Sequence, residues 1–144
     1  MVVARCVAEA PAEESPVIVR TLESVEKSAF FVNFGNGTSH RFLTAIDKMG
    51  FTVCYTIMEP GKESHQEYRN HLEACFCISG TGEIEDAEGN IFAIGPGLIY
   101  ALDKHDRHYL RSGKDEPLVL LSVFNPALTG TEVHEFTDEG ASSY

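Results

Sequence analysis

The sequence predicts an all-β domain, either a sandwich or a small barrel, with one short helix before it. From Phe30 onward, apolar, aromatic and β-branched residues gather in short runs that are separated by Gly- and Pro-containing corners. Many short strands at this spacing are typical of two-sheet β architectures. The chain of 144 residues has the length of one ordinary domain and contains no internal repeat.

The first elements lie near the N-terminus. Residues 1–16 are rich in Ala, Glu and Pro, and we expect them to form a disordered extension. Order should begin with a short strand over residues 17–20. Thr21 is a suitable N-cap, because its hydroxyl can accept a hydrogen bond from a free backbone N–H, and it predicts a brief helix over residues 22–27.

Strands and turns make up the rest of the predicted domain. Asn36-Gly37 is a strong hairpin dipeptide and predicts the first tight turn. Gly95-Pro96-Gly97 predicts a later corner. The predicted strands are Phe30–Phe34, Arg41–Ile46, Phe51–Met58, Leu72–Ile78, Gly82–Asp86, Ile91–Ile94, Leu98–Leu102, His108–Arg111 and Leu118–Phe124.

The C-terminal segment is polar and acidic. The predicted domain spans residues 17–135, and residues 136–144 form an acidic tail. One interpretation of residues 129–139 is a frayed terminus. The other is a segment that folds over the barrel mouth, because Glu132 and His134 alternate as on one face of a strand.

Charge and composition exclude several classes of partner. With 11 basic and 22 acidic residues the net charge is -11, so no basic stripe exists to bind a nucleic acid or an anionic membrane. No apolar run approaches the roughly 18 residues of a membrane span. The N-terminus lacks the apolar core of a signal peptide, and the four cysteines are interpreted as small buried side chains of a reducing compartment. We therefore expect a cytoplasmic protein.

A charged residue interrupts the strand predicted over residues 72–78. Glu73 lies in an otherwise apolar run, where an unpaired carboxylate is costly. His108 closes a second patterned stretch that begins at Gly97. A metal ion would account for both residues, since a hard carboxylate and a borderline imidazole can share one ion inside a barrel.

Two spaced motifs resemble those of the cupin superfamily. The matching positions are Gly61, Glu73 and Gly80 for the first motif and Gly97, Asp103, His105 and His108 for the second. Glu67 and Arg69 stand where the first motif has its paired histidines. The usual cupin site of three histidines and one glutamate is therefore excluded.

Four longer sequence segments resemble one branch of that superfamily, the ectoine synthases. They are Tyr68–Ala74, Gly82–Asp86, Tyr100–His108 and Phe124–His134, and the resemblance covers about residues 17 to 135. It implies a single-domain cupin β-barrel of jelly-roll type. It also implies a lyase that closes N-γ-acetyl-L-2,4-diaminobutyrate to ectoine, a compatible solute made under osmotic stress, with loss of one water.

The resemblance further implies an iron site. The family holds Fe(II) with Glu, Tyr and His, which correspond to Glu73, Tyr100 and His108. Three ligands leave coordination positions open for the substrate, as metal-ion catalysis requires. His71, two residues before Glu73, is expected to orient that ligand.

The resemblance assigns the substrate to a second set of residues. They are Arg41, Thr56, Tyr68, Phe124, Glu132 and His134, with Tyr68, Glu132 and His134 as the candidate catalytic residues. Arg41 suits the substrate carboxylate, because its guanidinium binds planar anions in a bidentate way. The expected partners are this small molecule and a second copy of the chain, since exposed barrel edges need covering.

Two departures from the family keep alternatives open. The pocket Trp of the family falls at Gly37 or a neighbour, and the chain contains no Trp. Ser122 stands where the family commonly has Cys. One alternative is a related cupin enzyme that acts on another N-acylated diamino acid or runs the reverse hydrolysis. The other is a non-catalytic cupin that binds a small ligand, and the iron trio favours catalysis over it.

Overall fold

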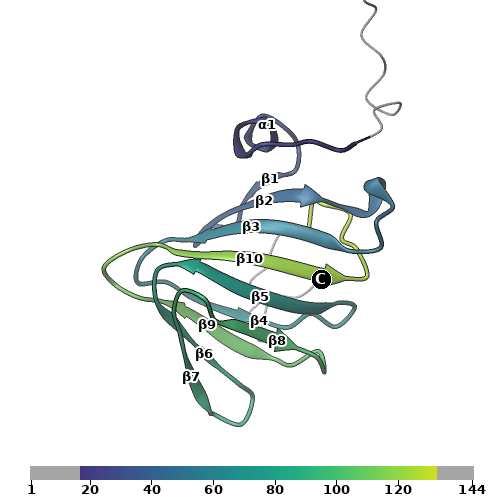
Figure 1. Ribbon diagram of the computed structural model, residues 1–144. Coiled ribbons are helices and arrows are strands. Elements are labelled where there is room, and N and C mark those ends of the chain that lie inside the picture. The colour runs from purple at the N-terminus through teal and green to yellow at the C-terminus, as the bar shows by residue number, and fades with distance from the viewer. Residues whose placement is uncertain (1–16, 133–144) are drawn as a thin grey trace, which may run out of the picture.

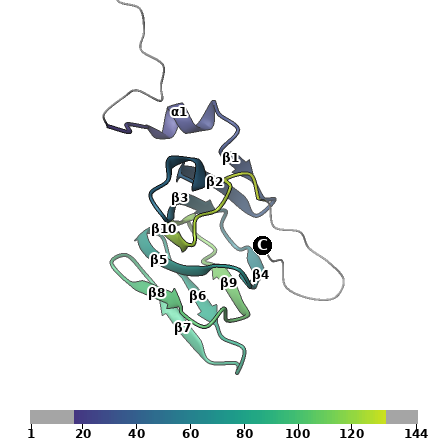
Figure 2. The same cartoon turned by 90° about the vertical axis from the view of Figure 1, so that its right-hand side faces the viewer.

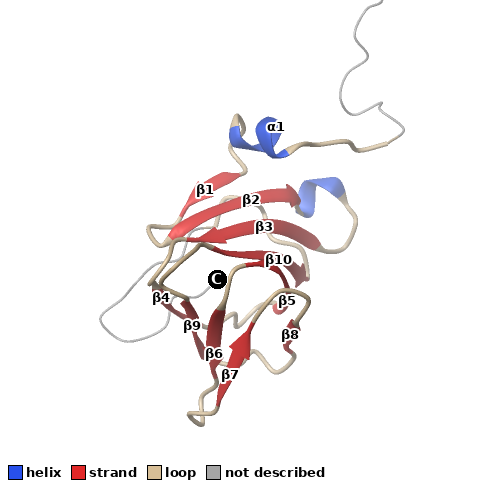
Figure 3. Cartoon of the chain, turned by 60° about the vertical axis from the view of Figure 1, so that its left-hand side comes forward, coloured by secondary structure: helices blue, strands red, loops and turns tan. Residues whose placement is uncertain are grey.

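The chain folds into two antiparallel β-sheets. A computed structural model describes residues 17–132. The elements are α1 Leu22–Glu26, β1 Phe31–Asn33, β2 Gly37–Leu43, a 3₁₀ turn Ala45–Asp47, β3 Thr52–Met58, β4 Glu63–Gln66, β5 Leu72–Ser79, β6 Gly82–Glu85, β7 Ile91–Ile94, β8 Ile99–Leu102, β9 His108–Ser112 and β10 Leu118–Asn125. Six strands form one sheet in the order β1-β2-β3-β10-β5-β8, and four form the other in the order β4-β9-β6-β7. Figure 1 and Figure 3 show the two layers, and the all-β prediction is confirmed.

The interior lies between the inner faces of the two sheets. On β5 the inward residues Cys75 and Cys77 are each 1% exposed, whereas Phe76 between them is 42% exposed, as the two-residue period of a strand requires. Leu120 on β10 and Leu110 on β9 pack into the same cluster from opposite sheets. The cysteines of the described region are free and buried, which agrees with their interpretation as small core side chains.

The N-terminal helix is fixed by its cap and by one buried histidine. Thr21 and Ser24 form a reciprocal capping box, and Thr21 Oγ1 accepts from the backbone N–H of Ser24 at 3.1 Å, which confirms the predicted N-cap. Val25 is buried, and Glu26 lies 2.9 Å from Nε2 of His40 on β2. These contacts hold α1 against the β1–β2 side of the larger sheet (Figure 2).

Two predicted strands near the N-terminus were wrong in extent or kind. Residues 17–20 form no strand, and the Arg20 guanidinium instead pairs with Asp47 at an N–O distance of 2.6 Å. The second strand begins at Gly37 rather than Arg41 and ends at Leu43, before the 3₁₀ turn. The predicted hairpin does form, because β1 pairs antiparallel with β2 across this turn, and the positive φ of 88° in the turn lies at Gly35.

One strand was missed altogether. β4 pairs with β9, with Ser64 opposite Leu110 and Gln66 opposite His108. Its inward residues Ser64 and Gln66 are polar, so the strand lacks the apolar alternation by which strands are recognised.

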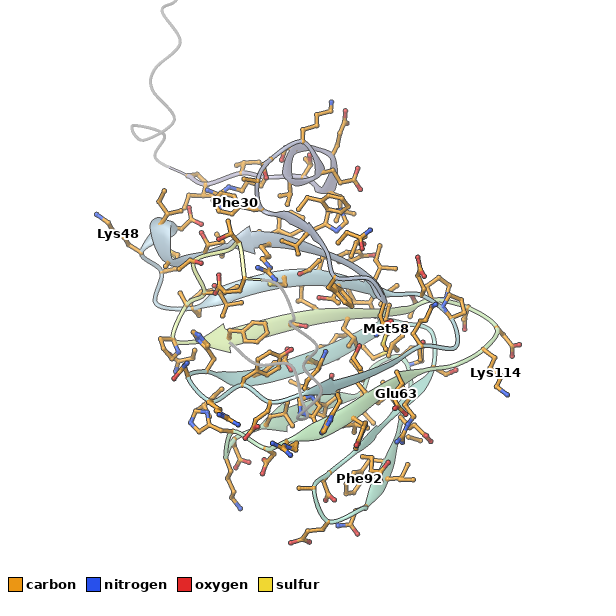
Figure 4. All side chains as sticks on the ribbon, turned by 180° about the vertical axis from the view of Figure 1, so that it is seen from behind. Phe30, Lys48, Met58, Glu63, Phe92 and Lys114 are labelled. Carbon is orange, nitrogen blue, oxygen red and sulfur yellow. The ribbon has the colours of Figure 1, made fainter. Side chains whose placement is uncertain are left out.

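All the strands that carry predicted site residues meet at one end of the barrel, which we call the mouth. β2, β4, β8 and β10 end there, and β3, β5 and β9 begin there, as the antiparallel registers require. Figure 4 shows Lys48 at this end, in the loop before β3, and Met58 and Lys114 at the opposite end. Residues at opposite termini of neighbouring antiparallel strands are therefore brought together at the mouth.

The close approach of β2 and β3 generates the first prediction. A Cβ atom added at Gly37 would lie 1.9 Å from the carbonyl oxygen of Ile57, which is backbone and cannot move aside. Gly37→Ala should therefore lower the free energy of unfolding by at least about 2 kcal/mol in urea titrations. Gly95→Ala is the matched control, because a Cβ there meets nothing within 4 Å, and it should change stability by less than about 0.5 kcal/mol. Equal stability of the two variants would contradict this packing.

Candidate functional site

A cavity lined by both polar and apolar side chains lies inside the barrel and extends from the mouth towards Met58. Its walls combine six of the predicted site residues with several that were not predicted. The predicted ones are Arg41, Thr56, Tyr68, Glu73, Tyr100 and Phe124, and the additional ones include Phe34, Ser39, Cys54, Ser64, Gln66, Cys75 and Ser122. The open space among these side chains is about 30 Å³, on the order of one water molecule.

Glu73 is the most strongly perturbed acid of the cavity. It is the second residue of β5, faces inward and is 6% exposed. Burial raises the pKa of its carboxyl to about 8, and the neighbouring Cys75 thiol only partly offsets this by hydrogen bonding. Among the described residues, its Oε1 atom has no hydrogen-bond partner. A buried carboxyl in this condition favours a cation beside it.

Tyr100 faces Glu73 from the neighbouring strand. β8 pairs with β5 so that Tyr100 lies opposite Cys75, one diagonal step from Glu73. Burial, followed by the nearby Cys75 and Glu73, raises the pKa of the Tyr100 phenol well above its ordinary value. Within residues 17–132 its hydroxyl oxygen is also buried without a hydrogen-bond partner. Behind this pair, the Cys75 thiol lies 3.3 Å from the Ser122 hydroxyl.

His108 lies beside the cavity rather than in its wall. It is 1% exposed, and it lines, together with Tyr100, a groove between β8 and the β6–β7 hairpin. Its Nδ1 atom lies 2.9 Å from the backbone carbonyl oxygen of Asp106, and its Nε2 atom lies 3.1 Å from the side-chain amide of Gln66. Burial lowers the pKa of the imidazole, so the ring is neutral at physiological pH. Tyr100 thus borders both the cavity and the groove that His108 lines.

Arg41 supplies a buried cation on the opposite wall. It is 2% exposed and pairs across the strands with Cys54, which is equally buried. Burial raises the pKa of the Cys54 thiol to about 12, and the positive charge of Arg41 acts against that rise. Arg41 thus provides an anion-binding group inside the cavity.

Aromatic side chains form the wall nearest the mouth. Tyr68 and Phe124 are each 3% exposed, and their rings meet edge to face with centroids 5.1 Å apart. His71 does not orient Glu73 as predicted, because its Nδ1 atom bonds the carbonyl oxygen of Pro126 at 2.7 Å. His105, which the sequence analysis left without a role, anchors the loop before β5 through the carbonyl oxygens of Tyr68 and His71, at 2.8 and 3.0 Å.

Glu132 lies at the end of the described chain and closes a tight turn on itself. Its carboxylate accepts hydrogen bonds from the backbone N–H groups of Thr129, Gly130 and Thr131, and from the Thr129 hydroxyl. These bonds lower the pKa of Glu132 against the opposing effect of partial burial, so it stays charged at neutral pH. Its negative charge adds slightly to the rise that burial causes in the pKa of the Cys54 thiol. His134 lies outside the described residues.

The first cupin motif departs further from the usual pattern than its spacing indicated. Glu67 and Arg69 lie on the outside, where the Glu67 carboxylate is 3.3 Å from both Arg69 and Arg107. The inward positions of this segment are Gln66 and Tyr68. Gln66 was not predicted, and its only signal was its place on a strand that the hydrophobic pattern does not reveal.

The cavity fits a metal ion held partly by oxygen. Among residues 17–132, no three His, Cys, Asp or Glu side chains gather into a ready-made metal site. The predicted trio contains a phenol instead, and the unpartnered oxygens of Glu73 and Tyr100 are hard donors that a cation would stabilise in their charged forms. His108 adds a neutral imidazole from the neighbouring sheet.

Comparison with known proteins gives one consistent result. A family model described as ectoine synthase matches residues 17–143. An L-ectoine synthase of Vibrio parahaemolyticus is 48% identical over 119 residues, which cover 83% of this chain and 93% of that protein. The crystal structure of ectoine synthase from P. lautus superposes with a TM-score of 0.75 at 36% identity, covering 87% of this chain and 96% of that one.

A more distant structure confirms the predicted barrel type. A Cupin 2 conserved barrel domain protein from Salinispora arenicola superposes with a TM-score of 0.57 at 18% identity, covering 65% of this chain and 79% of that one. At this identity the likeness concerns the fold alone, and the fold is that of a cupin.

Burial of Glu73 generates a prediction about pH. In the folded, chelator-treated protein Glu73 keeps its proton up to about pH 8, whereas the unfolded chain releases it near the ordinary carboxyl pKa of 4.5. Wild-type stability should therefore fall as the pH rises through this window and level off above it. Glu73→Gln has no such proton to lose, so the unfolding free energy of the variant relative to the wild type should rise between pH 4.5 and 8, by up to about 5 kcal/mol. A difference between the two proteins that does not change with pH would contradict the shifted pKa.

Proposed function

The chain belongs to the ectoine synthase family, and we propose how its barrel carries out the ring closure that defines that family. The substrate is N-γ-acetyl-L-2,4-diaminobutyrate, and the product is the cyclic amidine ectoine. The 2-amino nitrogen forms a bond to the acetyl carbonyl carbon, and the bond between that carbon and its oxygen breaks. The oxygen leaves as water with two protons that come from the amino nitrogen.

Three requirements follow from this chemistry. An amide carbon is a poor electrophile, so its oxygen needs an electrophilic partner. The flexible substrate must be folded until its amine reaches the carbonyl carbon, and positioning of this kind can lower a barrier by several kcal/mol. Protons must move from the ammonium group to the departing oxygen.

The first requirement assigns the metal. We infer that Glu73, Tyr100 and His108 hold Fe(II), which when bound acts as a Lewis acid on the amide oxygen. The observation that carries this assignment is the pair of buried, unpartnered oxygens on Glu73 and Tyr100, since an apolar core would not retain either one. Both groups have raised pKa values because of burial, and a nearby cation favours their ionised forms.

The second requirement assigns the substrate-binding residues. Arg41 binds the substrate carboxylate, because it is a buried cation on the wall of the cavity. Thr56 contributes a hydroxyl from β3, and Tyr68 with Phe124 forms the aromatic wall. The small open space means that these side chains must move for the substrate to enter, and then close around it without bulk water.

The third requirement assigns proton transfer to the C-terminal segment. Glu132 is charged at neutral pH and suits pairing with the substrate ammonium better than taking its proton. His134 has an ordinary pKa of about 6.5, which suits a residue that accepts and returns a proton near neutrality. Tyr68 stands beside both Phe124 and His108 and is the remaining catalytic candidate, as a hydroxyl near the departing oxygen.

The outer face of the larger sheet bears on how the chain assembles. We infer a homodimer, because β5, β8 and β10 expose apolar residues on their outer face, among them Phe76, Ile99 and Val123. Light scattering at twice 15.8 kDa would support it. No helix of the described chain is long and apolar enough to cross a membrane, and we place the reaction in the cytoplasm.

A related substrate is the second candidate. The observations that favour it are Gly37, where the β2–β3 contact leaves no room for a side chain, and Ser122 in the cavity wall. Comparing turnover of the γ-acetyl substrate with that of its propionyl analogue distinguishes the two, and faster turnover of the analogue would favour the second candidate.

The iron assignment gives a direct test of this function. The iron-loaded protein should convert N-γ-acetyl-L-2,4-diaminobutyrate to ectoine, and chromatography measures the ectoine that forms. Glu73→Ala, Tyr100→Phe and His108→Ala should each lose most bound iron and more than about 100-fold of turnover while the β-sheet circular dichroism is kept. Tyr109→Phe is the matched control, because the Tyr109 ring stacks on His65 with centroids 4.1 Å apart, away from the cavity. If a variant at one of these three positions keeps its full iron content and turnover, that residue is not part of the iron site.

The C-terminal segment gives a separate test. Deletion of residues 133–144 removes His134 but keeps Leu128, which is 0% exposed and donates its backbone N–H to Thr52 Oγ1 at 2.8 Å. Fold and iron content should therefore be kept while turnover falls by about 100-fold or more. Deletion of residues 136–144 is the control, because it retains His134 and should preserve turnover. If the longer deletion cyclises substrate at the full-length rate, the assignment of His134 is wrong.

A further inference from the structure

The side-chain amide of Gln66 stands between the cavity and His108. Gln66 and His108 are direct cross-strand partners on β4 and β9, and they are 6% and 1% exposed. Gln66 lines the cavity together with Glu73 and Tyr100, whereas His108 lies behind it. The distance of 3.1 Å between Gln66 Oε1 and His108 Nε2 makes the amide the immediate neighbour of that ring nitrogen.

The other ring nitrogen determines the tautomer of His108. Nδ1 lies 2.9 Å from the carbonyl oxygen of Asp106, and a carbonyl oxygen can only accept, so Nδ1 carries the hydrogen. In the neutral imidazole, which is the form that ligates a metal, the lone pair then lies on Nε2. A half-turn of the Gln66 amide presents its NH₂ group to this lone pair, and the buried hydrogen bond is then complete on both sides.

A metal ligated by His108 needs the same lone pair. Nδ1 is held by a backbone carbonyl, so Nε2 is the nitrogen that remains for coordination, and it is the one directed at Gln66. The Gln66 amide and the metal ion therefore compete for one site on the ring.

We propose that Gln66 is a positioning residue that caps His108 Nε2 and is displaced from it when the metal binds. The proposal rests on the iron site proposed above. In the metal-free protein the Gln66 amide is the hydrogen-bond partner of His108 Nε2. Metal binding must break this hydrogen bond before His108 can act as the third ligand. Gln66 thereby weakens the affinity of the site for its metal.

The size of the effect follows from the hydrogen bond that is lost. Breaking one buried hydrogen bond corresponds to roughly three- to tenfold in an equilibrium constant. Gln66→Leu keeps a side chain of similar size and offers neither a hydrogen bond nor a lone pair to the metal. It should therefore bind Fe(II) roughly three- to tenfold more tightly than the wild type.

Anaerobic calorimetric titration of the chelator-treated full-length protein with Fe(II) tests this. Tyr109→Phe is the matched control, because Tyr109 follows His108 on β9 and its ring stacks on His65 with centroids 4.1 Å apart, away from the cavity. Its affinity for Fe(II) should stay within about twofold of the wild type. If circular dichroism shows that Gln66→Leu does not fold, Gln66→Ala takes its place with the same expectation.

The outcomes separate this proposal from the iron site. Affinity of the Gln66 variant equal to or weaker than that of the wild type would overturn the capping role and leave the iron site intact. A wild-type protein that binds no Fe(II) would remove the iron site and the capping role together. Long-range ¹H–¹⁵N spectra of the metal-free wild type provide the second readout: His108 should be the neutral Nδ1–H tautomer, and an Nε2–H tautomer overturns the proposal.

Discussion

The carboxyl group of Glu73 is the feature on which the interior of this barrel depends. It projects from a strand whose outer face carries Phe76 and Ile78, so it cannot turn to water without reversing the whole strand. The interior around it is accordingly polar, with Tyr100, Cys75 and Ser122 in the surrounding wall. The same cavity wall also carries the apolar Met58, Leu110 and Leu120, and the buried apolar cluster extends from Leu118 at one end of the barrel to Phe124 and Leu128 at the mouth.

Antiparallel pairing of the strands brings the other candidate site residues together with Glu73 at one end of the barrel. Glu73 begins its strand and Phe124 nearly ends the next one, and the two are direct partners in the ladder. On the opposite sheet, Gln66 ends β4 and His108 begins β9, and they too are partners. Function-bearing residues therefore sit at strand ends, where the barrel supplies rigidity and the loops supply access. The loops are themselves tied down, since the imidazole of His105 bonds the backbone of the segment that precedes β5.

Sequence patterns predict the parts of this fold that bury apolar residues in alternation. β3, β5, β8 and β10 were predicted within a few residues, and Thr21 marked the helix correctly. The strand predicted at residues 17–20 fails because strand propensity has no effect without a neighbouring strand to pair with, and Val19 there is 80% exposed. β4 was missed for the opposite reason: it is well paired, but its inward residues are polar because they line the cavity.

The site likewise contains some residues that the sequence reveals and others that it does not. Glu73 is visible in the sequence because a charge in an apolar run has a cost that must be met. Gln66 and the turn that surrounds the Glu132 carboxylate carry no such signal, since their roles arise from cross-strand pairing and from local backbone geometry. Resemblance to a family indicates which residues to compare, and the structure adds that Tyr100 borders both the cavity lined by Glu73 and the groove lined by His108.

We propose that Glu73, Tyr100 and His108 hold a metal ion in the interior of the barrel. X-ray absorption at the iron edge of the loaded protein tests it most directly, because a sulfur ligand from the adjacent Cys75 is readily told from oxygen and nitrogen. With Glu73, Tyr100 and His108 as ligands, the first coordination shell of the iron should contain oxygen and nitrogen, with one imidazole and no sulfur. A sulfur scatterer in that shell, or more than one imidazole, would contradict it.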